Sequence, residues 1–506
     1  MPDHERRAHI ELDVNAGHER AVKAPDDDTP FRILVLGDFS GDKSRGRAAP
    51  QAPLANRRPI PIDRDTVDEV IAHLGPRVVL DRASGEAVIV PIASIDDFHP
   101  DHLYDSLPLF ASLKAMRARL ANPATFADAA RELTYTHGDD AFSDTGARSE
   151  PAPAAPRPGH VLDAILGEAV TDTEEPGGDA LQQLIQRAIA PHLVPAADPR
   201  QDMLIAQVDR AIANAMRAVL HQRSFQALEA AWRSVWSLTR RLETDDHLQI
   251  YLLDVSAAEL VADLGNDSSP ERSALWRTIV DGSQGVPWSL LVGAFTFGWD
   301  DADLDVLSKL GMIGRRAGAP FLAGAAPRLA GADPFDRSSD ASEWSTRRIP
   351  AWESLRSSPE AAYLGLAAPR VLARLPYGAG GEECERLAFE ELGQPYDHAE
   401  FLWGNAAFAC AALLAQSFSA AGWRMRPGSR RELTGLPYAL LRMNGGVEAK
   451  PCAEVLLTER SSNRMLECGI MPLASLKDQD AALLVRFQSI AQPTTALAGR
   501  WQAGRA

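Results

Sequence analysis

A proline-rich stretch, Ser143 to Gly159, is the feature that most constrains how this chain of 506 residues can fold. Its sequence is SDTGARSEPAPAAPRPG, with four prolines between Pro151 and Pro158. Proline fixes φ and removes a backbone donor, so the stretch forms neither a helix nor a central strand and is typical of a semi-extended tether. Single domains rarely exceed roughly 250 to 300 residues. The chain therefore needs two or more units, and the stretch marks a boundary between them.

Composition and charge narrow the classes of function. Apolar residues make up 45% of the chain and charged residues 24%, as in soluble globular proteins, and the formal net charge is −17. An acidic chain lacks the general basic face that binding to nucleic acid or anionic lipid requires, although a local basic patch stays open. Residues 1–24 have no apolar signal core, and no apolar run approaches the roughly 20 residues that span a bilayer. We expect a cytoplasmic protein, or one that leaves the cytoplasm only as part of a machine.

The residues before the tether predict a compact α+β unit that ends near Leu133. Buried strands are indicated at Phe31 to Leu36 (FRILVL) and at Ile60 to Asp63. Apolar residues recur at helical spacing from Val67 to Leu74. A strand pair is expected at Arg77 to Leu80 and Glu86 to Pro91, followed by a helix that carries Leu107, Leu109, Leu113 and Met116.

The residues after the tether begin with helical patterns and continue with alternating strands and helices. Helices are predicted at Val161 to Leu166, Leu181 to Ile189, Met203 to Leu220 and Ser224 to Arg241. Strands are predicted at Leu248 to Asp254, Ser289 to Phe297 and Phe321 to Ala323, with a helix after Asp303. The fold class is therefore mixed, α+β and α/β, with a small N-terminal domain tethered to a larger one.

One glycine-containing loop invites comparison with a phosphate-binding loop. Gly37-Asp-Phe-Ser-Gly41-Asp42-Lys43-Ser44 follows a predicted strand, but it has three residues between the glycines instead of four. Asp42 also stands between the second glycine and Lys43, where an acidic side chain would repel a phosphate. We do not predict a nucleotide site here.

The densest group of metal-ligand residue types lies at a predicted helix start. Asp96, Asp97, His99, Asp101 and His102 surround Pro100, a place where Asp commonly caps backbone N–H groups. Helix capping is the favoured interpretation, and a metal site is the alternative. The cysteines have no zinc-ligand spacing, which favours buried free thiols; they are Cys384, Cys410, Cys452 and Cys468.

Two further groups of residues are candidates for ligand binding or catalysis. Trp232 and Trp236 lie one turn apart on a predicted helix with arginines nearby, and they are interpreted as core or interface anchors instead of a stacking platform for nucleic acid. Glu390 and Glu391 are adjacent, so on a helix they point about 100 degrees apart and cannot share a proton across a substrate. No HExxH or GxSxG motif occurs. We predict no catalytic residue, no cofactor and no metal.

Several long motifs, in one order, carry a resemblance to a known family. Phe31 to Gly41, Arg58 to Asp65 and Asp97 to Pro100 resemble the small subunit (TssB) of the type VI secretion contractile sheath. Six further segments resemble the large subunit (TssC): His221 to Arg233, Leu252 to Leu260, Leu364 to Arg370, Arg374 to Gly378, Phe389 to Glu391 and Leu402 to Phe408. The chain is therefore similar to a fusion of the two subunits (ImpB and ImpC in another naming), over most of residues 30–135 and 160–495.

The resemblance implies a structural subunit. In the family, the two subunits interlock into one protomer, protomers polymerise around an inner tube on a baseplate, and neighbours exchange terminal β-strands. Contraction drives effector delivery, and an AAA+ unfoldase recycles the sheath through a helix of the large subunit, which corresponds here to Leu162, Ile165 and Leu166. Candidate core or interface residues lie in the family motifs: Glu229, Trp232, Arg233, Pro369, Arg370, Tyr377, Trp403 and Asn405.

The family pattern divides the chain into four segments. Residues 1–29 form a polar leader, 30–135 a TssB-like domain, 136–160 a Pro/Ala-rich linker and 161–506 a TssC-like domain that is expected to lack the usual C-terminal strand segment. Because the subunits are joined and that segment is not seen, an accessory that caps the sheath or docks it on the baseplate is an alternative to a polymerising subunit. An enzyme or a nucleotide-binding protein is the rival from another class.

Overall fold

The structure is a computed structural model of the whole chain, in which ten ranges are described. These are residues 25–41, 53–80, 88–138, 198–265, 269–282, 285–332, 340–345, 349–393, 395–443 and 446–502. The tether from Ser143 to Gly159 and the two helices predicted between Val161 and Ile189 lie outside the described residues.

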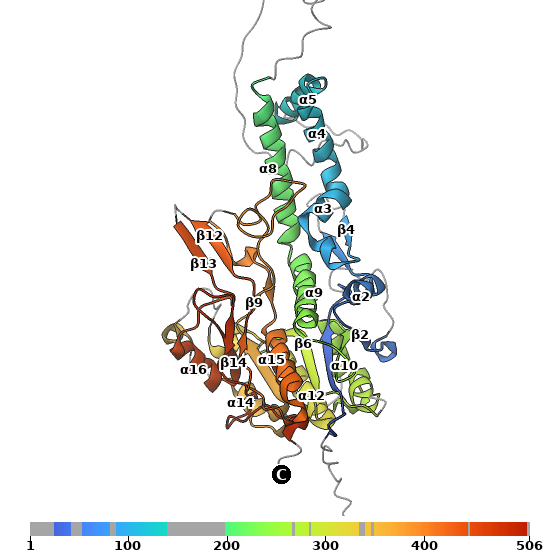
Figure 1. Ribbon diagram of the computed structural model, residues 1–506, viewed down its shortest axis with the longest axis vertical. Helices are drawn as coiled ribbons and strands as arrows, with labels where there is room; N and C mark the ends of the chain where they lie inside the picture. Colours follow the sequence, from blue (N-terminus) through green and yellow to red (C-terminus); the bar gives the residue numbers. More distant parts are fainter. Residues whose placement is uncertain are drawn as a thin grey trace, which may run out of the picture.

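A nine-stranded, mainly parallel sheet forms the body of the protein (Figure 1). Its five central pairings, from β14 to β5, are parallel, and antiparallel strands complete both edges. In spatial order the strands are β11 (Glu432–Leu433), β15 (Ala482–Leu484), β14 (Ile470–Ser475), β8 (Leu364–Ala368), β7 (Phe321–Ala325), β6 (Leu290–Phe297), β1 (Phe31–Gly37), β5 (Leu248–Asp254) and β2 (Ile60–Ile62).

Strand β1 comes from the N-terminal region but lies inside the sheet of the larger region. It pairs with β5 along its whole length, from Phe31 opposite Leu248 to Gly37 opposite Asp254, and with β6 on its other side. The mixed fold class predicted from the sequence is confirmed. The N-terminal region is not a separately packed body, however, because its first strand is buried between two strands of the larger region.

Helices cover both faces of the sheet, and side chains of β1 alternate between the two layers. Ile33 and Val35 belong to the core formed with α9 (Arg223–Arg241) and α15 (Ala406–Ala421). Leu34 and Leu36 belong to a second core, with α10 (Ala257–Leu264) and α12 (Asp301–Ala317). This period of two, with apolar residues on both sides, is expected of a parallel strand covered on both faces. The second core also includes residues of α11 (Ala274–Trp276), α13 (Pro327–Ala330), α14 (Pro350–Arg356) and α16 (Glu459–Glu467).

A helical arm extends from the sheet, and both regions contribute to it (Figure 1). The N-terminal region supplies α3 (Pro100–Ser106), α4 (Ala111–Ala121) and α5 (Phe126–Gly138), and the larger region supplies α8 (Gln201–Leu220). The remaining N-terminal elements are α2 (Val67–Leu74) and the hairpin of β3 (Arg77–Leu80) and β4 (Val88–Pro91). Two short ladders complete the larger region: β9 (Val371–Leu372) with β10 (Trp403–Gly404), and β12 (Ala439–Met443) with β13 (Gly446–Lys450).

Most predicted elements are present near their predicted bounds. The strand at Leu248 to Asp254 is confirmed at both ends, and the helix predicted from Met203 to Leu220 begins two residues earlier. The helix predicted across Leu107 to Met116 is interrupted, because Pro108 opens a short 3-10 turn between α3 and α4. Proline lacks the N–H that a continuous helix needs at this position.

One helix among the described residues, Ala406 to Arg424, is long and apolar enough by length and composition to cross a membrane. In the structure this segment is mostly buried against β6, β7 and β8. The cysteines are free thiols, with Cys410 and Cys452 buried and Cys384 and Cys468 half-buried. Burial raises the pKa of the Cys410 thiol to about 12, so it is protonated at neutral pH.

Candidate functional site

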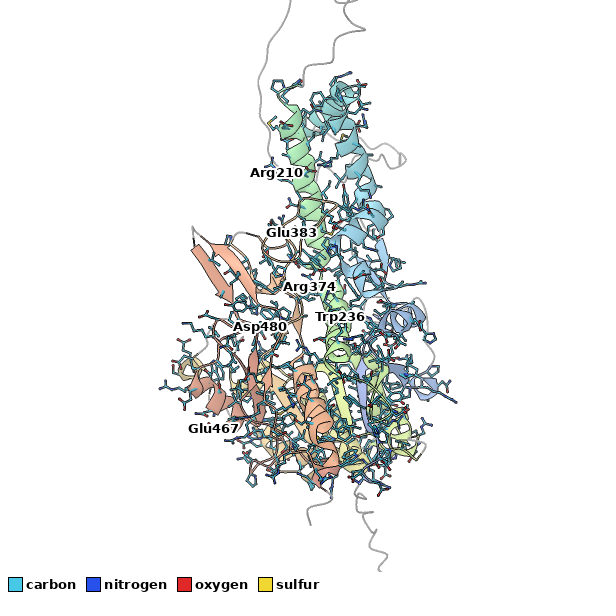
Figure 2. The ribbon with its side chains drawn as sticks, in the orientation of Figure 1. Arg210, Trp236, Arg374, Glu383, Glu467 and Asp480 are labelled. Carbon is cyan, nitrogen blue, oxygen red and sulfur yellow. The ribbon has the colours of Figure 1, made fainter. Side chains whose placement is uncertain are left out.

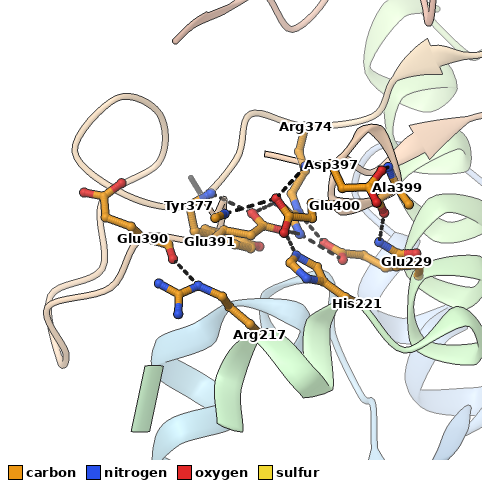
Figure 3. Close-up of polar contacts among 12 residues, drawn as sticks. Arg217, His221, Glu229, Arg374, Tyr377, Glu390, Glu391, Asp397, Ala399 and Glu400 are labelled. Carbon is orange, nitrogen blue, oxygen red and sulfur yellow. Dashed lines mark hydrogen bonds and ion pairs between the residues drawn. The ribbon is translucent and has the colours of Figure 1, made fainter. Parts of the chain in front are cut away.

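A buried ionic network lies where α9 meets the loop after β9 (Figure 3). Arg374 is at its centre, with its Nε 2.7 Å from Glu229 Oε1 and its Nη1 2.7 Å from Glu391 Oε2. A second contact, from Nη2 to Glu391 Oε1 at 2.8 Å, makes the pairing with Glu391 bidentate. The three side chains are 4%, 0% and 2% exposed, respectively. The planar guanidinium fork suits this geometry because each carboxylate can accept two of its N–H groups.

Arg233 and Tyr377 extend the network. Arg233 follows Glu229 by four residues on α9, and its Nε lies 2.8 Å from Glu229 Oε1, so the two side chains form an i,i+4 pair within the chain. Its Nη2 donates to the Tyr377 hydroxyl at 2.8 Å. The Tyr377 backbone N–H donates to Glu391 Oε2 at 2.8 Å, and the Arg374 guanidinium lies 4.0 Å from the centre of the Tyr377 ring.

The charges of the network compensate each other, with two carboxylates and two guanidiniums. Burial alone would raise the pKa of Glu229, but Arg374 and Arg233 more than offset it and hold this pKa below its ordinary value. Burial and the nearby carboxylates raise the pKa of Tyr377, so its hydroxyl stays protonated. His221 Nε2 lies 3.9 Å from Glu391 Oε1, and burial lowers the pKa of this histidine. Because two guanidiniums lie within hydrogen-bond distance of two buried carboxylates, the network is suited to holding these segments together.

The N-terminal region contacts this network directly. The His99 ring lies edge-on to the Tyr377 ring at 4.9 Å between centroids. The Asp101 carboxylate accepts from the backbone N–H groups of Glu385 and Arg386, at 2.9 and 3.0 Å. The network therefore lies under the joint between the two regions.

Trp232 fills the same joint nearer the sheet. Its indole N–H donates to the Phe39 carbonyl at 2.9 Å, its ring lies 5.2 Å from the Phe39 ring, and its side chain is 0% exposed. Trp232 therefore occupies a core position between the two regions. The half-buried Trp236 is covered by the Arg240 guanidinium at 4.3 Å.

The glycine-containing loop after β1 holds a carboxylate of the chain itself. Asp254 Oδ1 accepts from the backbone N–H groups of Phe39 and Ser40, at 2.8 and 3.1 Å. The position that a phosphate oxygen would take is therefore filled by an aspartate from the end of β5. This agrees with the failed spacing of the motif.

The group around Pro100 forms helix caps. Asp97 Oδ2 accepts from the Ser94 N–H at 3.0 Å within a capping box, and His99 Nδ1 accepts from the Asp101 N–H at 3.2 Å. Within the described ranges, no group of three or more His, Cys, Asp or Glu side chains is arranged to hold a metal ion. Capping is thus what the geometry shows at this place.

The other predicted residues lie around a second, smaller cluster. Glu454 is its acceptor: it is 2.5 Å from Arg370 Nη2 and 3.2 Å from His398 Nε2. His398 stacks on Trp403 at 4.8 Å, and the Trp403 N–H donates to the His398 carbonyl. Hydrogen bonds from His398 and Arg370 outweigh burial and lower the pKa of Glu454 to about 2. The Trp403 side chain is 7% exposed, which leaves little of it for another chain.

Pro369 and Asn405 position the backbone near these clusters. The Ala368-Pro369 peptide bond is cis and directly follows β8. Asn405 is the N-cap of α15: its Oδ1 accepts from the Ala407 N–H, and its Nδ2 donates to the Phe295 carbonyl of β6. The predicted helix of Leu162, Ile165 and Leu166 lies outside the described residues.

Sequence reasoning missed Arg374, Glu391 and His221 as members of the site. Glu391 adjoins Glu390 in the sequence, but the two differ in the structure: Glu391 is buried, whereas Glu390 lies at the surface. A usable signal was the occurrence of Arg374 and Glu391 in two separate family motifs, since a buried Arg requires a carboxylate partner.

Comparison with known proteins agrees with this geometry. The family model described as VipB, tail sheath N-terminal domain, matches residues 202–491, which is more than half of the chain. The model described as Type VI secretion system, VipA, matches residues 3–140. The chain belongs to the VipA/VipB family of type VI secretion sheath proteins. It joins a TssB-like and a TssC-like part in one polypeptide.

Two curated relatives come from Pseudomonas aeruginosa. The type VI secretion system sheath protein TssC1 is 32% identical over 306 residues, which are 58% of this chain and 61% of TssC1. The sheath protein TssB1 is 31% identical over 129 residues, which are 24% of this chain and 70% of TssB1. The chain thus spans less than two thirds of the length of TssC1 and about seven tenths of TssB1.

Proposed function

We propose that this chain is a structural subunit of a type VI secretion contractile sheath, in which one polypeptide supplies both halves of a protomer. The observation that carries the proposal is β1, which belongs to the TssB-like part and lies between β5 and β6 of the TssC-like part. A central strand shared in this way makes the two parts one folding unit. Membership of the sheath family supports the proposal that this unit assembles into a contractile sheath.

The role is scaffolding in the cytoplasm, without chemistry. The Arg and Glu side chains of the buried network pair with one another, the loop after β1 is filled by Asp254, and the Asp/His group around Pro100 caps helices. The partners we propose are other copies or separate sheath subunits, an inner tube protein, a baseplate and an AAA+ unfoldase that reads Leu162, Ile165 and Leu166. Contraction of the assembly around the tube would drive effector delivery.

Electron microscopy of the purified full chain tests this proposal. We expect tubules, either from the chain alone or after mixing with separate sheath subunits. Discrete particles that bind only to the ends of preformed sheath would overturn it in favour of the capping or docking accessory.

A thermal-shift panel of nucleotides and divalent metals tests the absence of chemistry. A ligand present at 100 times its dissociation constant stabilises a protein by about 2.7 kcal/mol. We expect no such shift for this chain, and a reproducible shift with one nucleotide would contradict the scaffolding role as the full account.

A further inference from the structure

A cavity of about 320 Å³ lies between the β12–β13 hairpin and the loop that carries Tyr377. Most of its lining is apolar: Pro376, Leu392 and Tyr396 come from the loop side, and Leu440 comes from β12. Its volume falls within the range of about 300–1,000 Å³ that is usual for ligand pockets. The function proposed above assigns no role to this cavity.

Strand β12 borders the cavity with its free edge. Among the described residues, β12 pairs with β13 and with no other strand. The Leu440 carbonyl oxygen lies near the loop on the other side, since an ideal Cβ atom on Gly380 would be 3.5 Å from it. A free strand edge offers backbone N–H and C=O groups to an extended segment. Backbone hydrogen bonding and a pocket for a side chain are therefore available in the same place.

The rim of the cavity continues into an exposed apolar surface on the β12–β13 hairpin. Leu440 is 51% exposed, and Val447 on β13 is 66% exposed. Leu440 is opposite Ala449, two residues from Val447, so both side chains lie on the same face of the hairpin. The hairpin projects from the body beside the arm (Figure 1). Exposed apolar side chains that adjoin a cavity are typical of a binding surface.

Carboxylates at the mouth of the cavity have no cationic partner. Glu390 lines the cavity, Glu382 and Glu383 lie in the same loop, and all three are exposed. The arginine of this loop, Arg386, pairs with Asp105 instead. Within the part of the chain that the structure describes, no Arg, Lys or His side chain forms an ion pair with the three carboxylates. The mouth of the cavity is therefore a site of uncompensated negative charge.

The loop fixes the position of Glu390. Its Oε1 accepts from the Ala379 N–H at 3.1 Å. Arg217 Nε donates to the Glu390 backbone carbonyl at 2.9 Å, and the carboxylate points away from this arginine (Figure 3). Gly378 has a φ of 134°, and a Cβ atom there would lie 2.2 Å from Glu390 Oε2, so glycine leaves room for the carboxylate. The charge at the mouth is thus held in place before a ligand arrives.

We propose that this cavity is a docking site for a basic, apolar segment of another protein, which inserts a large apolar side chain and places Lys or Arg beside Glu390. The cavity removes the apolar side chain from water, and the unpaired carboxylates attract the cations. Charge complementarity selects this partner, because an acidic segment meets three like charges. The chain's own net charge of −17 disfavours a second copy as the occupant.

The docking site goes beyond the proposed sheath function and does not depend on polymerisation. Binding of a segment is measured on the full chain in solution, whereas the sheath function is judged from tubules in micrographs. The two proposals can therefore fail separately.

Fluorescence anisotropy with three labelled peptides tests the docking site on the full chain. The first peptide has a central Phe-Leu pair with two lysines on each side. The second has glutamates in place of the lysines, and the third has Ser-Gly in place of the Phe-Leu pair. We expect the chain to bind the first peptide at least about tenfold more tightly than either of the others, because each of the others lacks one of the two attractions.

Two variants and two matched controls locate the binding on the protein. Glu390→Gln removes the charge but keeps an oxygen for the Ala379 N–H, and it should weaken binding of the first peptide about threefold. Leu440→Ser removes the apolar rim and should weaken it at least about fivefold. Glu467→Gln on α16, 70% exposed and well apart from the hairpin in Figure 2, and Leu456→Ser, 46% exposed, lie outside the cavity lining. These two controls should change the affinity by less than about 1.5-fold.

The proposal is overturned if the first peptide shows no binding at about 1 mM. It is also overturned if the glutamate or Ser-Gly peptide binds as tightly as the first, or if the two control variants weaken binding as much as Glu390→Gln and Leu440→Ser. A concentration-dependent dimer of the wild type that Leu440→Ser abolishes, measured by analytical ultracentrifugation, would overturn it in favour of a second copy as the occupant.

Discussion

The N-terminal region meets the rest of the chain in two places, the sheet and the helical arm, which bury apolar side chains to a different extent. In the sheet, Phe31, Ile33, Leu34, Val35 and Leu36 are 0% exposed, and each strand neighbour belongs to the larger region. In the arm, α4 packs along α8 (Figure 2), and only the face of α4 that carries the 0% exposed Leu113 is buried. The exposed pair Arg117–Asp209 joins the two helices, with Nε 2.6 Å from Oδ1.

The difference shows which contact makes the two regions one unit. Burial of apolar side chains stabilises by roughly 25 cal/mol per Å² removed from water, whereas an exposed ion pair contributes about 0–1 kcal/mol. Strand β1 buries apolar side chains on both of its faces and α4 on one, so we expect the sheet joint to contribute more to holding the regions together than the arm does. Four changes, in order of expected effect, test this ranking.

Arg374→Ala should have the largest effect. It leaves Glu229 and Glu391 buried side by side without the cation between them, and breaking a buried pair typically costs about 3–5 kcal/mol. We expect a loss of about 5 kcal/mol in the free energy of unfolding, measured by urea denaturation, because Glu391 loses its bidentate partner and Glu229 keeps only Arg233. Arg386→Ala, in the same loop but 65% exposed, is the control and should lose less than about 1 kcal/mol. Equal losses in the two variants would show that the network is hydrated.

Leu34→Ala should rank second. Its side chain is 0% exposed in the second core, and Leu→Ala changes at such sites cost about 3–4 kcal/mol. Leu204→Ala on α8 is the matched change in the arm, where the side chain is only partly buried, and it should cost about 1 kcal/mol. Urea denaturation of both proteins measures the difference. If the arm variant loses as much as the sheet variant, the ranking of the two places is wrong.

The sequence alone predicts local elements of the fold but not the pairing of distant segments. Local patterns predict β5 from Leu248 to Asp254, because strand patterning acts over a few residues. The place of β1 was not predictable from pattern, since Phe31 pairs with Leu248 across more than two hundred residues. A buried apolar strand has the same sequence pattern at any central position of a parallel sheet, so the pattern does not specify which two strands are its neighbours.

Some residues of the candidate site could be predicted from the sequence, and others could not. Trp232 and Tyr377 were found through family motifs, whereas the joining of Arg374 to Glu391 required the fold. Residues 388–391 have no helix, strand or turn assignment, and the segment places Glu391 inward and its neighbour Glu390 at the surface. Long-range pairing of charges is a property of packing, and a sequence shows only that a buried arginine needs a partner.

Acid should weaken the body of the protein through Glu454. Its folded pKa of about 2 lies below the ordinary 4.5, so the stabilisation is present above about pH 4.5 and is lost as the pH falls toward 2. The shift corresponds to about 3 kcal/mol. We expect Glu454→Gln to lose about this much at pH 7 and to show a flatter decline in stability between pH 4.5 and 2, measured by denaturation at each pH. An unchanged slope in the variant would place the acid sensitivity in another carboxylate.

Arg117→Ala should have the smallest effect and is the sharpest test of the arm. A double-mutant cycle with Asp209→Ala, measured by urea denaturation, should give a coupling of about 0.5 kcal/mol, because both side chains are partly in water. That coupling should shrink further in 0.5 M salt, by roughly half, as exposed charges are screened. A coupling above about 2 kcal/mol, insensitive to salt, would mean that this pair is desolvated in solution. The arm would then be a second joint of the same kind as the sheet, and the N-terminal region would be fastened at both ends.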